Sequence, residues 1–122
     1  MLIKIDFGSD EAIYMQLRNQ IIRGIATAQL KEGESLPSVR QMADEIGINM
    51  HTVNKAYAVL REEGIIQLSR RRGAVIAIDV NRLQALADMK KQLAVVLAKG
   101  WCKNITKEEV YTLVDEIFEE YC

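Results

Sequence analysis

Residues 36–64 read LPSVRQMADEIGINMHTVNKAYAVLREEG and contain two apolar stripes with helical spacing. Each stripe places apolar side chains at positions i, i+3, i+4 and i+7, which brings them to one face of a helix. The first stripe consists of Val39, Met42, Ala43 and Ile46, and the second consists of Val53, Ala56, Tyr57 and Leu60. The spacing therefore predicts two short helices that share one apolar core.

The ends of both predicted helices carry residues that begin or stop helices. Ser38 can cap the first helix, and Gln41, three residues later, can return the hydrogen bond as a capping box. Gly47 can supply the left-handed conformation that ends this helix, and Asn49 is placed to cap the second, which Gly64 ends. A tight turn containing glycine between two helices is typical of a helix-turn-helix.

The exposed side chains of this pair favour contact with DNA. His51, Asn54 and Lys55 lie opposite the apolar stripe of the second helix, with Thr52 beside them. Such side chains suit a helix whose first turns enter the major groove. Arg40 lies in the opening turn of the first helix, whose free N–H groups favour a phosphate. An ordinary solvent-exposed helical hairpin is the alternative that periodicity leaves open.

The chain before this pair is expected to supply a third helix. It is predicted to begin at Ser9 or Asp10 and to end near Ala28. Its apolar stripe is Ile13, Leu17, Ile21 and Ile25, and the residues expected to lie largely outside are Gln16, Arg18, Asn19 and Arg23. The alternating residues Leu2–Phe7 before it are predicted to form a short strand or an extended arm.

A basic turn follows the helix pair. Two apolar, β-branched runs, residues 65–69 and 74–78, flank it and predict two short strands. The turn consists of Arg70, Arg71, Arg72 and Gly73. This arrangement predicts the wing of a winged helix, with a cationic tip that contacts phosphates or the minor groove. A solvent-exposed charged hairpin turn is the alternative.

Two further amphipathic helices are predicted after the wing. Asp79 is placed to cap the first, which is expected to run to about Lys99 and to end at Gly100. Thr106 and Glu109 form a capping box before the last helix. Because the winged helix already has its own core, these apolar stripes need a partner surface. A homodimer through the C-terminal helices is the simplest partner.

The length of 122 residues allows one domain, or one domain with an appendage. The predicted fold class is mainly α with a small β-hairpin: a winged helix-turn-helix DNA-binding domain in residues 1–78, followed by a two-helix dimerisation tail in residues 79–122. The net charge of −1 does not indicate a basic nucleic-acid coat. Charge is unevenly distributed, however, because the basic run 70–72 contrasts with six acids and one base in residues 106–122.

Little in the sequence suggests catalysis, a cofactor or a membrane. His51 is the only histidine, so a His-based metal cluster or catalytic triad cannot form within one chain. Cys102 and Cys122 lack metal-ligand and disulfide-framework spacing and are interpreted as reduced thiols of a cytoplasmic protein. The longest apolar run, residues 93–98, is far shorter than the roughly 20 residues that span a bilayer. We expect no enzymatic activity, cofactor, metal or membrane segment.

Several separated motifs resemble the N-terminal domain of GntR-family bacterial transcription regulators. They cover about two thirds of the chain in the family's order: Ala12–Leu17, Gly33–Arg40, Thr52–Tyr57 and Leu60–Ile66. The run Asn49–Tyr57 and the short length are similar to the YtrA subfamily, whose members carry only a small helical tail. The resemblance implies a dimeric winged-helix regulator that acts as a repressor by occupying a palindromic operator in double-stranded DNA.

Helix position and the match to the family's recognition helix together predict base or phosphate contacts by Asn49, Met50, His51, Thr52, Asn54 and Lys55. The residues expected to position the protein on phosphates are Ser38, Arg40, Arg70, Arg71, Arg72 and Gly73. Met50 departs from the arginine or proline common at its position, which leaves the base preference open. Arg71 and Ala74 replace the glycine and hydroxyl residue usual at the wing tip, which leaves the path of the tip open.

A second function remains as an alternative: a helical, dimeric ligand-sensing or protein-interaction adaptor whose winged helix does not read DNA. Neutralising the basic run 70–72 separates the two, because only a DNA binder should lose affinity steeply. Trp101, between the two terminal helices, either packs in an interface or lines a pocket for an unknown small apolar effector.

Overall fold

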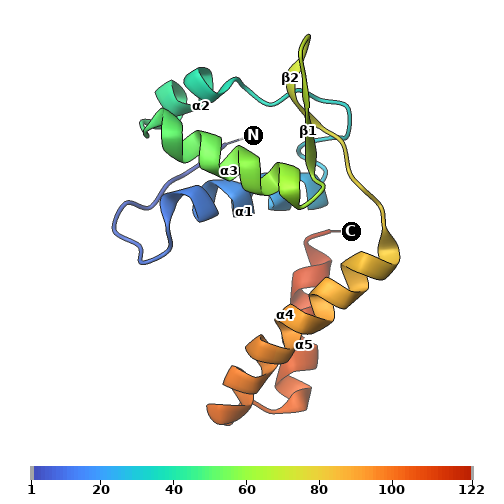
Figure 1. Ribbon diagram of the computed structural model, residues 1–122. Helices are drawn as coiled ribbons and strands as arrows, with labels where there is room; N and C mark the ends of the chain where they lie inside the picture. Colours follow the sequence, from blue (N-terminus) through green and yellow to red (C-terminus); the bar gives the residue numbers. More distant parts are fainter. Residues whose placement is uncertain (1, 122) are drawn as a thin grey trace. The chain divides into compact units, whose positions relative to one another are not determined.

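The computed structural model describes residues 2–121 (Figure 1). Its elements in chain order are α1 (Ile13–Ala26), α2 (Val39–Ile46), α3 (Met50–Glu62), β1 (Ile66–Ser69), β2 (Gly73–Ile76), α4 (Arg82–Cys102) and α5 (Lys107–Glu119). The two strands form one antiparallel hairpin. The predicted fold class, mainly α with a small hairpin, is confirmed. The chain divides into two compact units, one ending at Asp79 and one beginning at Val80.

The helix-turn-helix has the predicted caps. Ser38 Oγ accepts a hydrogen bond from the backbone N–H of Gln41 at 3.1 Å, and Asn49 Oδ1 accepts one from the N–H of His51 at 2.7 Å. Gly47 ends α2 in the left-handed conformation, with φ of 72°. The capping box predicted at α2 is only half formed, because the Gln41 side chain makes no return bond within residues 2–121.

The core of the first unit joins α1, α2, α3 and the hairpin. Seven large side chains in it are almost fully buried: Leu17, Ile21, Met42, Val53, Leu60, Ile66 and Ile76. Fully burying one leucine or isoleucine side chain contributes about 1.5–3 kcal/mol. The two predicted stripes of the helix pair thus meet in one core, and α1 covers it.

α1 begins at Ile13, so the predicted start at Ser9 or Asp10 is wrong. Ser9 stabilises a turn before the helix instead: its Oγ accepts from the N–H of Glu11 at 3.0 Å, and its own N–H donates to the carbonyl of Asp6 at 3.3 Å. Ala12 then precedes the helix without a side-chain cap. At the other end α1 stops at Ala26, and Ala28 has a φ of 63°, which an α-helix does not allow.

The N-terminal arm, residues 2–7, forms no strand and is attached to α1 by two glutamines. Gln16 Oε1 accepts from the N–H of Asp6 at 2.8 Å, and Gln16 Nε2 donates to the Asp6 carbonyl at 2.9 Å. Gln20 binds Lys4 in the same way, at 2.9 and 2.6 Å. Gln16 and Gln20 are four residues apart, which is a rise of about 6 Å along a helix. Asp6 and Lys4 are two residues apart, which is about 6.6 Å along an extended chain, so the spacing of the two glutamines matches that of their partners. Gln16, predicted to lie outside, is only 6% exposed because it binds this arm.

The wing is a two-stranded hairpin whose β2 also pairs, along its free edge, with the loop before α2. β1 pairs with β2 in the register Ile66 to Ile76 and Ser69 to Gly73. On its other side β2 pairs with the loop before α2: the N–H of Gly33 donates to the Ile76 carbonyl at 2.8 Å, and the N–H of Leu36 to the Ala74 carbonyl at 2.8 Å. The base of the wing is therefore fixed to the same segment that leads into the helix-turn-helix.

The second unit differs from its prediction at two helix ends. Asp79 does not cap α4, because the helix begins later, where Asn81 Oδ1 accepts from the N–H of Gln84 at 3.2 Å. Gly100 does not end α4 but lies inside it, and Asn104, with φ of 63°, takes the left-handed conformation after the helix. A Cβ at Gly100 would lie 3.6 Å from the Ile105 Cβ, an ordinary van der Waals distance, so the position accepts the helix without a strained contact.

The capping box of α5 is confirmed. Glu109 N–H donates to Thr106 Oγ1 at 3.2 Å, and Thr106 N–H donates to Glu109 Oε1 at 2.9 Å. No residue of α4 or α5 is buried. Within residues 2–121, none of the helices has both the length and the apolar character that crossing a bilayer requires.

Candidate nucleic-acid interface

A surface hollow of about 620 Å³ lies where α2 and α3 begin. It is lined by Val39, Asn49, Met50, His51 and Asn54. All of these except Val39 are among the predicted DNA contacts. Met50, the first residue of α3, is 45% exposed there. The structure thus brings four of the six predicted base-proximal residues to one surface hollow, whose lining does not include Thr52 and Lys55.

The polar residues of this hollow differ in what they can offer a ligand. Asn49 uses its Oδ1 to cap α3, so its amide group is partly committed to the helix. Asn54 and His51 are exposed, and neither side chain has a partner within residues 2–121. Thr52 is half-buried beside them. Asn54 therefore keeps its full set of two donors and a two-lone-pair acceptor for a base edge.

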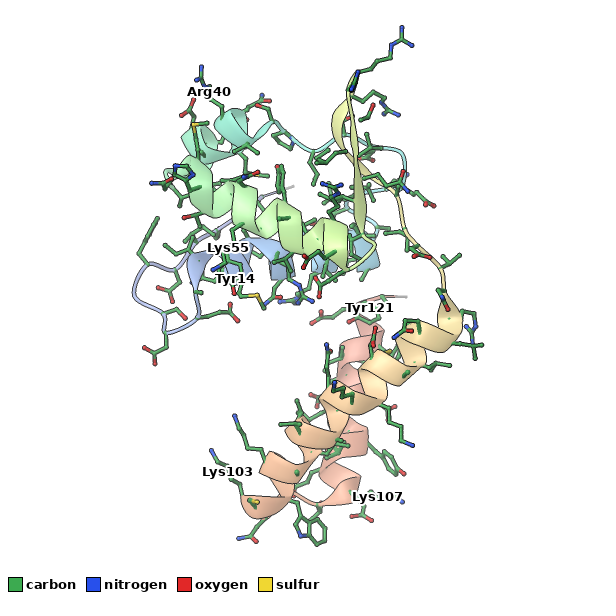
Figure 2. All side chains as sticks on the ribbon, in the orientation of Figure 1. Tyr14, Arg40, Lys55, Lys103, Lys107 and Tyr121 are labelled. Carbon is green, nitrogen blue, oxygen red and sulfur yellow. The ribbon has the colours of Figure 1, made fainter. Side chains whose placement is uncertain are left out.

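The start of α2 supplies the second part of the candidate interface. Arg40 is exposed in its first turn and has no partner within residues 2–121 (Figure 2). The segment before it is anchored by α3, because the Tyr57 hydroxyl donates to the Pro37 carbonyl at 2.7 Å. Burial raises the pKa of Tyr57, and the nearby charge of Glu45 raises it further, so the hydroxyl stays protonated as a donor.

The three arginines predicted at the wing tip differ in whether their side chains have a hydrogen-bond partner. Ser69 Oγ accepts from the backbone N–H groups of Arg71 and Arg72, at 3.3 and 3.2 Å, which shapes the turn. Arg72 then folds back, and its Nη2 donates to the Gly33 carbonyl at 2.5 Å. The side chains of Arg70 and Arg71 are exposed without a partner within residues 2–121. Gly73, with φ of 72°, takes the left-handed conformation that closes the turn.

Lys55 has a partner that sequence analysis did not place in the site. Its Nζ lies 4.1 Å from the centroid of the Tyr14 ring, on α1. Tyr14 belongs to the predicted helix, but no spacing rule relates two residues so far apart in the chain. A second contact between the same helices is structural: the Arg18 guanidinium binds the Glu63 carboxylate through two nitrogens.

The tail contains the other residues singled out by sequence. Trp101 is 76% exposed beside a hollow of about 550 Å³ that also involves residues 104–108. Cys102 is exposed and free, and Cys122 lies outside the described residues. Within residues 2–121, no three His, Cys, Asp or Glu side chains are grouped closely enough to hold a metal ion.

Comparison with known proteins identifies this arrangement. The family model described as bacterial regulatory proteins, gntR family, matches residues 10–76, which span α1 to β2. The chain belongs to the GntR family. GntR proteins are transcriptional regulators, so the expectation that the chain is not an enzyme is confirmed.

Full-length relatives place the chain among the short GntR regulators. The HTH-type transcriptional repressor YtrA of Bacillus subtilis is 33% identical over 119 residues, covering 95% of this chain and 92% of that protein. The solved structure of YtrA from Sulfolobus acidocaldarius, a GntR-family transcription factor, is 37% identical with a TM-score of 0.61, covering 97% of each chain. A transcriptional antiterminator from Listeria monocytogenes EGD-e superposes with a TM-score of 0.85 at 29% identity, covering 96% of this chain and 90% of that one. The predicted resemblance to a YtrA-like GntR regulator is confirmed.

Proposed function

We propose that this GntR-family protein represses transcription in the bacterial cytoplasm by occupying a palindromic operator as a homodimer. In this proposal the residues up to Asp79 bind DNA, and α4 and α5 form the dimer interface. The main support for a dimer is the exposed apolar surface of the tail. α4 has 21 residues and none is buried, and Val95, Val96 and Phe118 are more than half exposed. An exposed apolar surface spread over two helices is unusual in a monomer and is typical of an association site.

A second copy of the same chain is the proposed occupant of this surface. Each copy of the chain has a single α3, and the first turns of one such helix can contact only one half-site of DNA. A two-fold axis through the tails would present two such helices to two half-sites, which doubles the base contacts without any new residue. The YtrA relative of Bacillus subtilis is a transcriptional repressor, which supports the same mode of action.

Within each half-site, we propose a division between base and phosphate contacts. Met50, His51 and Asn54 face bases, whereas Arg40, Lys55 and the exposed wing arginines bind phosphates. Ser38, Asn49 and Gly73 shape the backbone at these points, and Thr52 lies at the edge. Arg72 is expected to position the wing through Gly33 rather than to reach DNA.

The hollow at the start of α3 also suggests a base preference. Neither arginine nor lysine lines it, and these are the commonest readers of guanine. Asparagine pairs with both hydrogen-bonding groups of adenine, and an apolar side chain can contact the methyl group of thymine. We therefore propose that Asn54 and Met50 face A·T base pairs.

Selection from a pool of random duplex DNA at two salt concentrations tests this function. The expected result is a palindromic motif with A·T pairs inside each half-site and an affinity that falls as salt rises. Binding without a motif, at either salt concentration, would refute operator recognition. Unchanged binding after Arg70 to Arg72 are all replaced by glutamine would favour the adaptor function instead.

Sedimentation of the full chain tests the dimer. The proposal predicts a dimer for the wild type and a monomer for Leu93→Glu, which places a charge on the apolar surface of α4. Lys91→Glu, on the same helix but already charged, is the matched control and should remain dimeric. A monomeric wild type at operator-binding concentrations would contradict the proposal.

A further inference from the structure

Tyr14 and Lys55 form a contact between α1 and the exposed face of α3. The Lys55 Nζ lies 4.1 Å from the ring centroid, within the range of a cation–π interaction. Tyr14 is half-buried and packs against the core of the first unit, so its ring has a fixed position. Lys55 is exposed, and within residues 2–121 no carboxylate binds it.

Lys55 lies at one border of the exposed face of α3 and Arg40 lies beyond the other. His51 and Asn54, which line the hollow shared with α2, are between them. Figure 2 shows Arg40 on α2 and the Tyr14–Lys55 pair on α1 and α3 at opposite sides of the α3 ribbon. The two cations therefore flank the proposed base-reading surface.

A helix in the major groove has a phosphate strand on each side of it. We propose that Tyr14 is a positioning residue for DNA binding: its ring holds the Lys55 ammonium at the α1 border of α3, where it binds the phosphate strand opposite the one bound by Arg40. This inference rests on the proposed DNA interface and adds α1 to it. A single helix-turn-helix would then contact the phosphate strands on both sides of the major groove.

An aromatic ring suits this role better than an acid. A carboxylate would offset the positive charge of Lys55 and weaken its attraction for phosphate. A ring attracts the ammonium through its π face and leaves the charge and the outward N–H donors available. It also restricts a side chain with four rotatable bonds, so less conformational entropy is lost when the phosphate is bound.

A double-mutant cycle on the selected operator tests the inference, using the full chain. The variants are Lys55→Met, Tyr14→Leu and both together, and the measurement is the Kd at several salt concentrations. Lys55→Met should lower the magnitude of the salt slope by about one per protomer. Tyr14→Leu should raise the Kd by about two- to five-fold per protomer in the wild type, and should have no effect when Lys55 is already methionine.

A second pair of variants separates ring electrostatics from folding. Tyr14→Phe keeps the negative π face and should bind like the wild type, whereas pentafluorophenylalanine in place of Tyr14 keeps the shape, reverses the quadrupole and should bind as weakly as Tyr14→Leu. Thermal melting of each variant establishes that it is folded at the assay temperature. Because the two rings pack alike, a difference between them cannot come from lost packing.

The outcomes distinguish the two proposals. If Lys55→Met changes neither the Kd nor the salt slope, Lys55 binds no phosphate and that part of the proposed interface fails together with this inference. If Lys55→Met weakens binding but Tyr14→Leu acts equally in both backgrounds, or the two rings bind alike, only the positioning role of Tyr14 is refuted.

Discussion

The hydroxyl of Tyr57, on α3, donates a hydrogen bond of 2.7 Å to the carbonyl of Pro37, immediately before the residue that caps α2. This bond ties α3 to the start of α2, whose first turn carries Arg40. The proposed base-reading and phosphate-binding residues are thus held at a fixed spacing by a side chain that contacts neither. Removing this hydrogen bond should lower the stability of the folded protein.

Tyr57→Phe should lower the free energy of unfolding by about 1 kcal/mol, because it removes one partly buried hydrogen bond and leaves the Pro37 carbonyl without its donor. Chemical denaturation measures this loss. Tyr14→Phe is the control, since the Tyr14 hydroxyl has no hydrogen bond within residues 2–121. Equal losses in both variants would show that the Pro37 bond contributes nothing specific.

Alkaline pH should remove the contribution of Tyr57. Burial, and then the charge of Glu45, raise the pKa of this phenol above its ordinary value of 10.0. The unfolded chain therefore releases the proton at a pH where the folded protein still holds it, so stability is fully present below about pH 10 and is lost as the pH rises further. Denaturation at pH 8 and above pH 10 should show the gap between the wild type and Tyr57→Phe closing. A constant gap would contradict the raised pKa.

Gly64→Ala should destabilise the protein more than Gly47→Ala. Both glycines have φ near 73°, at 74° and 72°, so both alanines carry a backbone strain of about 1–2 kcal/mol. Only at Gly64 would the new Cβ also meet another side chain, 2.9 Å from the Cβ of Asp79, whereas nothing lies within 4 Å at Gly47. Thermal melting of the two variants compares them directly. A Gly47 variant that is equally or more destabilised would argue against the close contact with Asp79.

Gln16→Leu should release the N-terminal arm. The substitution leaves the N–H of Asp6 without a partner and leaves its carbonyl only the bond from the Ser9 N–H, which we expect to cost about 1–3 kcal/mol. Hydrogen exchange of the peptide covering residues 2–7 should become fast while exchange of α3 stays slow. Gln20→Leu, where the bonds to Lys4 are exposed, should have a smaller effect. The ladder between arm and helix is disproved if neither variant changes exchange in the arm.

Arg40→Ala and Asn54→Ala should impair DNA binding in different ways. Loss of the Arg40 charge should weaken binding to every sequence and reduce the magnitude of the salt slope by about one per protomer. Loss of the Asn54 amide should change sequence preference by about 1–3 kcal/mol at one position and leave the slope intact. Competition binding with matched and mismatched operators measures both. Equal weakening on all sequences by Asn54→Ala would remove it from the base-reading set.

Met50→Arg offers a complementary test of the same surface. An arginine at the first residue of α3 would add a bidentate guanine reader to a hollow that contains no cation. The variant should select a motif in which a G·C pair replaces an A·T pair in each half-site. Selection of an unchanged motif would indicate that position 50 does not face the bases.

The local parts of this fold could be predicted from the sequence. The stripes of α2 and α3, the caps at Ser38, Asn49 and Thr106 and the stop at Gly47 all arise from interactions within about seven residues of one another. Such interactions depend only on helical geometry and side-chain chemistry. The helix ends expected at Ser9, Asp79 and Gly100 are wrong. Ser9 stabilises a turn before α1, the Asp79 N–H donates to the Gly64 carbonyl at 2.8 Å, and α4 continues through Gly100.

The tertiary structure alone decided which of the predicted contact residues have partners. Arg72 binds the carbonyl of Gly33, 39 residues away, whereas its neighbours in the basic run remain exposed. Gln16 is buried because it binds the arm, and Lys55 lies on Tyr14 because α1 packs against α3. The helices, the hairpin and the family could all be predicted from the sequence. Pairings between distant residues depend on how these elements pack, since periodicity records which face of a helix is apolar but not what lies against its polar side chains.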